Sequence, residues 1–236
     1  DLLLAGKLVA IPTETVYGLA ANALNEKAVA GIFEAKNRPH FDPLIVHISS
    51  IDQLSQYAKN IPAKAMYLAE KFWPGPLTLV LNKSDLIPDL VSSGLNTVGI
   101  RMPNHHLTLE LLKKLAFPLA APSANPFGYV SPTRASHVND QLGDKIEYIL
   151  DGGHSEMGLE STIIGFDDYE NPQILRLGAL SLEEINNTLA GSVRLNLNQH
   201  SNPLAPGQLD SHYSPKKRMH LLNDEEISDE IKQNPN

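Results

Sequence analysis

Cations stand at several positions of this sequence where an apolar, strand-like run gives way to a turn. Arg101 ends the run "VGIR" and Arg176 ends "QILR", while Lys36 and Arg38 close an amphipathic segment. Ligands of α/β proteins gather in the crevice outside strand ends, so this arrangement indicates a binding site. Cations of this kind suit a ligand that carries several negative charges.

Small hydroxyl and amide side chains stand at similar places. Thr15 follows the run "LVAIP", Ser123 and Asn125 lie in "APSANPFG", and Ser161 follows a Gly-rich turn. Each position also has a structural interpretation, because such residues form turns or fill strand ends. His47, within "LIVHI", is more typical of a satisfied core residue, although the nearby strand end also allows a ligand role. The residues alone leave both interpretations open.

Several classes of function are disfavoured by what the 236 residues lack. There is no GxxxxGKS/T loop, no GxGxxG, no HExxH and no GxSxG. A formal net charge of -8 argues against stable direct binding of nucleic acid. The absence of cysteine fits a reducing cytoplasm, where we expect the protein, and no apolar run suits a membrane span. Composition and spacing therefore predict an α/β protein that binds a small polyanion.

Periodicity predicts a mixed α/β sheet, since some strands alternate with helices and others follow one another directly. Short Val-, Ile- and Leu-rich runs predict strands at Lys7–Ile11, Leu44–Ile48, Leu77–Leu81, Thr97–Arg101, Pro118–Ala121, Ile146–Leu150, Ser161–Phe166 and Gln173–Leu177. Helices are predicted at Glu26–Lys36 with Asn25 as N-cap, Pro62–Trp73, His106–Leu115, and Ser181–Leu189 with a capping box.

The composition changes after about residue 190, where the chain becomes rich in Asn, Ser, Pro and Gly. Loops of this length tend to be functional or disordered, so we expect a linker or lid at 191–215 after a catalytic domain at 1–190. Residues 216–236 are too few to bury a core, and we expect them to begin a truncated C-terminal domain. The first residue is Asp1 rather than Met, so we expect residues to precede it.

Seven motifs in sequence order resemble the YrdC-like family of threonylcarbamoyl-AMP synthases. They are "PTETVYGL", "KNRP" with "PLIVHI", "WPGPLT", "VGIRMP", "APSAN" with "SPT", "GLESTI" with "ILRLG", and, in the longer two-domain members, "SHYSP". The family hallmarks K-x-R and S-x-N are present as Lys36–Arg38 and Ser123–Asn125. The resemblance implies a twisted mixed parallel and antiparallel sheet, flanked by helices, around a central ligand cavity.

The resemblance also implies a reaction, in which L-threonine, bicarbonate and ATP with Mg²⁺ give threonylcarbamoyl-AMP and pyrophosphate. The product would pass to the machinery that threonylcarbamoylates adenosine 37 of ANN-decoding tRNAs. Lys36 and Arg38 would be catalytic, and Mg²⁺ would be held mainly by phosphates. Threonine would contact Thr15, His47, Arg101, Ala121 and Ser161. ATP would contact Lys36, Arg38, Asp42, Thr97, Ser123, Asn125, Ser131, Arg176, His212 and Tyr213.

Two residues depart from the family pattern, and two other functions compete. Asp42 stands where members commonly carry Asn, and Leu177 replaces the Pro of "LRPG". One alternative is a carbamoyl-adenylate-forming domain of the hydrogenase-maturation type, although such domains belong to longer chains with zinc-finger-like cysteines. The other is an RNA-binding module of the same fold, which the net charge of -8 disfavours.

Overall fold

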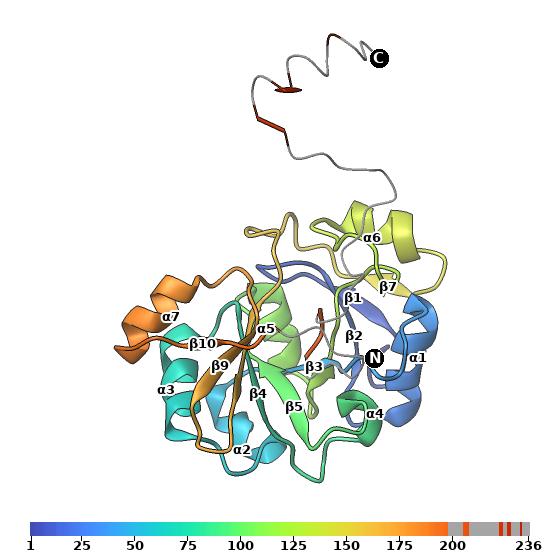
Figure 1. Cartoon of the computed structure of the whole chain (residues 1–236). Helices are drawn as coiled ribbons and strands as arrows, with labels where there is room; N and C mark the ends of the chain where they lie inside the picture. Colours follow the sequence, from blue (N-terminus) through green and yellow to red (C-terminus); the bar gives the residue numbers. More distant parts are fainter. Residues whose placement is uncertain (198–204, 208–221, 224–225, 228–231, 233–236) are drawn as a thin grey trace.

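A computed structural model describes residues 1–197, 205–207, 222–223, 226–227 and 232 of the chain (Figure 1). Its described part forms a ten-stranded sheet in the order β10-β9-β8-β4-β5-β3-β6-β2-β1-β7. The strands are β1 Val9–Ile11, β2 Gly18–Asn22, β3 Ile45–His47, β4 Leu77–Asn82, β5 Thr97–Arg101, β6 Leu119–Ala120, β7 Tyr148–Ile149, β8 Thr162–Phe166, β9 Pro172–Arg176 and β10 Arg194–Leu195.

The sheet is mixed, as the sequence predicts. Parallel pairs are β1 with β7, β3 with β5, β4 with β8 and β9 with β10, while the remaining neighbours are antiparallel. In the parallel pair at the centre, His47 lies opposite Arg101. The register therefore places two of the candidate site residues side by side at the ends of adjacent strands.

Helices flank the sheet at both ends (Figure 1). They are α1 Glu26–Lys36, α2 Leu54–Tyr57, α3 Ala63–Phe72, α4 Asp89–Ser92, α5 His106–Lys113, α6 Ala135–Leu142 and α7 Leu182–Leu189, with a 3-10 helix, η1, at Ile51–Gln53. The largest buried apolar cluster joins α1 and α3 to the sheet and includes Val29, Phe33, Leu68 and Leu79. No helix in the described residues is long and apolar enough to cross a membrane.

The local signals in the sequence explain how α1 begins and ends. The Asn25 side chain accepts hydrogen bonds from the backbone N–H groups of Lys27 and Ala28, as an N-cap should. At the other end Asn37 adopts a left-handed conformation with φ of 50°, which turns the chain out of the helix. Lys36 and Arg38 therefore leave the helix end in different directions.

The predicted elements are all present, although eight of the twelve are shorter than predicted by one to three residues, half of them at both ends. The capping box of Ser181 and Glu184 is confirmed. Pro62 is the N-cap of α3 rather than its first residue. The sequence prediction missed β2, β10, α2, α4 and α6. The missed strand β2 reads "GLAAN", whose small residues have little strand propensity and owe their conformation to pairing with β1 and β6.

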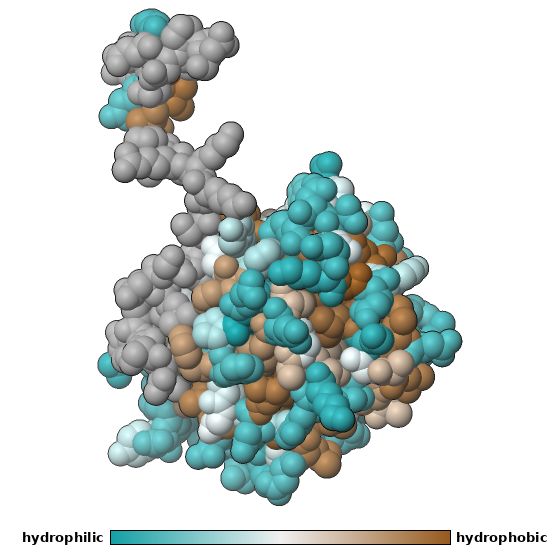
Figure 2. All heavy atoms as spheres, turned by 90° about the vertical axis from the view of Figure 1, so that its right-hand side faces the viewer, coloured by the Kyte–Doolittle hydropathy of each residue, from teal (hydrophilic) through white to brown (hydrophobic). Residues whose placement is uncertain are grey.

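The surface beside α1 and α6 carries mixed hydrophilic and hydrophobic residues (Figure 2). On the described part of that face the two kinds are interspersed, so it shows no broad apolar patch.

Candidate functional site

A cavity opens at the ends of several strands and is lined by residues from widely separated parts of the sequence. Eight of the candidate site residues line it: Thr15, Arg38, His47, Arg101, Ala121, Ser123, Ser161 and Arg176. The lining also includes Thr13, Val16, Tyr17, Gly18, Ile45, Pro122, Glu160 and Pro206. The fold thus gathers three guanidinium groups, an imidazole and several hydroxyls around one space.

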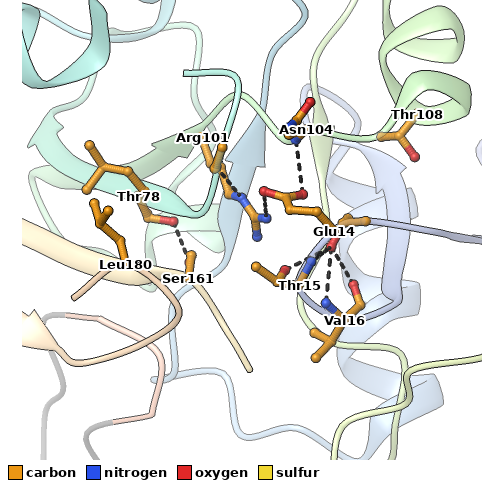
Figure 3. A network of polar contacts seen from close by, with 12 residues as sticks. Glu14, Thr15, Val16, Thr78, Arg101, Asn104, Thr108, Ser161 and Leu180 are labelled. Atoms are coloured by element: carbon orange, nitrogen blue, oxygen red, sulfur yellow. Dashed lines mark hydrogen bonds and ion pairs between the residues drawn. The ribbon is translucent and has the colours of Figure 1, made fainter. Parts of the chain in front are cut away.

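Arg101 is held by a buried ion pair at one side of the cavity. Its Nη2 atom lies 2.6 Å from Glu14 Oε1, and its Nε donates to the Gly75 carbonyl at 3.2 Å. The other carboxylate oxygen of Glu14 accepts a hydrogen bond from the Asn104 backbone N–H at 3.0 Å (Figure 3). Because both side chains are almost fully buried, the guanidinium has a fixed orientation.

His47 lies beside Arg101 as a neutral imidazole. Burial, and secondarily the charge of Arg101, lowers the pKa of His47 from 6.5 to about 3. Its Nδ1 atom is buried and has no hydrogen-bond partner in the described part of the chain. A buried polar atom of this kind is costly unless something binds it. His47 can therefore exchange a hydrogen bond with a polar group that enters the cavity.

Ser161 connects two strands at the opposite side of the cavity. Its Oγ lies 2.8 Å from Thr78 Oγ1, and its carbonyl accepts hydrogen bonds from Arg176 Nε and Nη2 at 3.1 and 2.9 Å (Figure 3 shows the pair with Thr78). Gly178 packs so closely that a Cβ there would lie 2.3 Å from the Glu160 carbonyl oxygen. The backbone of 160–161 is therefore tightly held.

One described residue of the expected linker, Pro206, lines the cavity, and its neighbour Ala205 packs nearby. Ala205 is buried in a small apolar cluster with Ile45 and Leu175. The Pro206 carbonyl accepts a hydrogen bond from Arg176 Nη1 at 3.2 Å, and Pro206 itself lines the cavity. His212 and Tyr213, which the family resemblance assigns to ATP, lie outside the described residues.

Lys36 and Arg38 have different positions, although both belong to the K-x-R motif. Lys36 is fully buried and does not line the cavity; its Nζ donates to the backbone carbonyls of Ser123 and Asn125. Burial, followed by the charge of Arg38, lowers the pKa of Lys36 well below its ordinary value. In this structure Lys36 holds the S-x-N loop from outside the cavity lining, while Arg38 lines the cavity.

Asp42 is a fully buried partner of Arg38 and does not line the cavity. Arg38 Nη2 lies 2.9 Å from Asp42 Oδ2, an ion pair without the alignment of a hydrogen bond, and Arg38 Nε donates to the Asp42 carbonyl at 3.1 Å. Burial raises the pKa of Asp42, and the neighbouring cations oppose this effect. Asp42 therefore balances the charge of Arg38.

Three further candidate residues lie outside the cavity lining. The Asn125 side chain donates to the carbonyls of Pro126 and Tyr129 at 2.9 Å and so shapes its own loop. Ser131 Oγ donates to Glu160. Thr97 lies in a separate cleft with Asn82, because it begins the strand that Arg101 ends. The structure does not bring Thr97 to the other candidate residues.

Sequence reasoning missed Glu14, Tyr17 and Glu160 as site residues. Tyr17 lines the cavity and its hydroxyl donates to the Gly153 carbonyl at 2.7 Å; burial raises the pKa of Tyr17. A signal for Glu14 was present, because a carboxylate placed directly after a buried strand needs a cation, and Arg101 was available. No comparable local signal marked Glu160.

Two family models match the chain. The Sua5/YciO/YrdC family model, described as "Telomere recombination", matches residues 1–178. The chain belongs to this family. A second model, "Threonylcarbamoyl-AMP synthase, C-terminal domain", matches residues 180–236, and so begins before the linker expected from residue 191.

Curated members of the Sua5/YciO/YrdC family are similar over most of the chain. A protein from Pyrococcus abyssi named "Threonylcarbamoyl-AMP synthase" is 50% identical over 214 residues, which are 89% of this chain and 62% of the relative. One of the same name from Bacillus subtilis is 45% identical over 218 residues, 91% of this chain and 62% of the relative. The chain thus spans less than two thirds of these relatives.

Solved structures of the family confirm the fold. The crystal structure of P. abyssi Sua5 complexed with L-threonine has a TM-score of 0.92 and 46% identity, covering 98% of this chain and 70% of that one. E. coli YciO has a TM-score of 0.69 and 21% identity, covering 78% and 89%, and shows the shared fold alone. The predicted α/β fold with a mixed sheet is therefore confirmed.

Proposed function

We propose that this chain carries the catalytic region of an L-threonylcarbamoyladenylate synthase, which forms threonylcarbamoyl-AMP and pyrophosphate from L-threonine, bicarbonate and ATP. The observation that carries the proposal is the cavity, where three arginines, a neutral histidine and several hydroxyls meet. The names of the similar proteins and the threonine-bound relative support the same reaction.

Threonine fits the side of the cavity that contains Arg101 and His47. A guanidinium presents the planar donor pair that binds a carboxylate, and the ion pair with Glu14 fixes its orientation. His47 lines the cavity, so its neutral imidazole can exchange a hydrogen bond with the threonine hydroxyl. An amino acid without that hydroxyl would lose this hydrogen bond, which gives a physical basis for selecting threonine.

ATP fits the side that contains Arg38, Ser123 and Arg176. In the proposed reaction the threonine ammonium loses a proton, and the free amine attacks the carbon of CO₂, or that of bicarbonate with loss of water, to give an N-carboxylate. A carboxylate oxygen then bonds to the α-phosphorus, the bond from that phosphorus to the bridging oxygen breaks, and pyrophosphate leaves with the electron pair. No protein nucleophile is needed, so catalysis consists of positioning and electrostatic stabilisation. Arg38 would act on the phosphates, and Lys36 would position the Ser123 loop.

Mg²⁺ would accompany the nucleotide. The described residues contain no group of three His, Cys, Asp or Glu side chains that could hold a metal ion. Mg²⁺ commonly binds substrate phosphates and water with one or two carboxylates, so this donor set fits an ion held mainly by ATP. When bound there, Mg²⁺ would neutralise phosphate charge.

The product would serve threonylcarbamoylation of adenosine 37 in ANN-decoding tRNAs through a separate transfer machinery. The net charge of -8 supports a protein that does not bind nucleic acid stably itself. It disfavours the alternative of an RNA-binding module, for which salt-dependent binding of duplex RNA without ATP turnover would be the evidence.

Pyrophosphate release tests the proposal. The chain is incubated with MgATP, bicarbonate and one amino acid at a time, and with carbamoyl phosphate as the substrate of the alternative carbamoyl-adenylate reaction. We expect release with threonine, a much smaller rate with serine, and none with alanine or carbamoyl phosphate. Release that is independent of threonine, or that requires carbamoyl phosphate, would refute the proposal.

A further inference from the structure

Glu160 differs in charge from every other ionisable side chain that is described in the cavity lining. Arg38, Arg101 and Arg176 are cationic and His47 is neutral, while Glu160 contributes the one carboxylate among these lining residues. A cavity built only to bind anions gains nothing from a carboxylate, because it repels the ligand. Its presence therefore calls for a positive group on the ligand.

The Glu160 carboxylate has capacity left to bind such a group. It accepts a hydrogen bond from Ser131 Oγ. It forms no ion pair with a lysine, arginine or histidine in the described part of the chain. An ionised carboxylate can accept several hydrogen bonds, so one hydroxyl does not saturate it.

The backbone around Glu160 is fixed by contacts on both sides. The Glu160 carbonyl accepts a hydrogen bond from the Ala179 N–H at 2.8 Å, and the Gly158 N–H donates to the Thr15 carbonyl at 3.0 Å. The next residue is Ser161, which is held by Thr78 and Arg176. Glu160 is therefore presented to the cavity from a rigid segment next to residues that line the same space.

We propose that Glu160 binds the α-ammonium group of the amino acid substrate, an inference that rests on the proposed function. A free amino acid is a zwitterion, so a site that recognises it needs a cation and an anion. Arg101 suits the carboxylate, and the nearby arginines would repel the ammonium unless a carboxylate offset them. Glu160 is the lining residue with that charge, and it thereby distinguishes an amino acid from a hydroxy acid of the same shape.

Two ligands and three proteins test this role by calorimetric titration without nucleotide. The ligands are L-threonine and (R)-3-hydroxybutyrate, which lacks only the ammonium. The proteins are the unaltered chain, Glu160→Gln and the matched control Glu156→Gln, in which an exposed carboxylate of the same loop is neutralised. Glutamine keeps the length of the side chain and an oxygen that can accept from Ser131, so a merely structural role is largely preserved.

We expect Glu160→Gln to weaken threonine binding about tenfold or more, as for a lost charge-assisted hydrogen bond, with (R)-3-hydroxybutyrate affected less than about twofold. Hydroxybutyrate should bind the unaltered chain about tenfold more weakly than threonine, and the titrations use concentrations at which this weaker binding is measured. Glu156→Gln should match the unaltered chain. The inference is overturned if Glu160→Gln binds threonine normally, or if it loses both ligands equally. Failure of the unaltered chain to bind threonine would instead refute the proposed function.

Discussion

The neutral His47 makes the stability of this protein depend on pH in a way that can be calculated. The unfolded chain protonates this histidine near its ordinary pKa of 6.5, whereas the folded chain has a pKa of about 3 there. Because the folded pKa is lowered, the unfolded state binds the extra proton first as the pH falls. The free energy of unfolding is therefore unaffected by His47 well above pH 6.5, and it falls as the pH decreases from about 6.5 to 3.

The magnitude at pH 5 hardly depends on the folded pKa, since the folded histidine is still neutral there. Linkage gives a loss of about 2 kcal/mol in the free energy of unfolding between pH 8 and pH 5, and of about 1 kcal/mol by pH 6. His105, whose pKa is also lowered by burial, adds a smaller dependence of the same sign. A variant is needed to separate the two.

Urea unfolding of the unaltered chain and of His47→Asn at pH 8, 7, 6 and 5 provides the test. Asparagine does not titrate, so the variant should lose about 2 kcal/mol less than the unaltered chain over this range, whatever its stability at pH 8. The difference between the two curves removes the contributions of the other histidines. Parallel curves would show that the pKa of His47 in the folded chain lies near 6.5, and the argument for an imidazole that stays neutral down to pH 5 would fail.

Three further changes have expected outcomes. Glu14→Gln leaves Arg101 buried without its ion-pair partner, so urea unfolding should show a loss of about 3 kcal/mol that the exposed control Glu110→Gln does not show; an unchanged midpoint would contradict this. Lys36→Met leaves two loop carbonyls without their donor, which lowers stability, but it also removes the cost of burying an ammonium. Because the two effects oppose each other, we expect stability to change little while pyrophosphate release falls about tenfold or more. Large destabilisation with normal turnover would reverse that assignment. Ser181→Ala removes a capping box outside the cavity lining and should cost about 1 kcal/mol in unfolding while leaving threonine affinity unaltered, as measured by denaturation and calorimetry.

Long elements with strong local signals could be predicted from the sequence. The helix α1 was predicted with both ends and its N-cap, because Asn25, the apolar face and the closing cation act within a single segment. Short elements such as β2 and α6 were missed because tertiary packing determines them, and "GLAAN" has no strand preference of its own.

Site residues could be predicted from the sequence where a side chain stands at the end of a strand. They were harder to predict where the orientation of the side chain depends on a contact with a distant part of the chain. Arg101 and His47 line the cavity because adjacent strands place them together. The position of Lys36 depends instead on two distant backbone carbonyls, which no local pattern reveals. Glu160 was missed because its importance follows from the charges around it, and these meet only in the folded chain.

The left-handed Asn37 between Lys36 and Arg38 has a consequence for which sequences this site can accept. On one side of this inversion Lys36 contacts the carbonyls of the Ser123 loop, and on the other side Arg38 lines the cavity. A β-branched residue would resist the inversion sterically, whereas Gly or Asn accepts it readily. The backbone conformation therefore restricts which residues can occupy position 37 of the hallmark motif. We expect natural variation at this position to be limited by stereochemistry, even though the side chain need not contact a substrate.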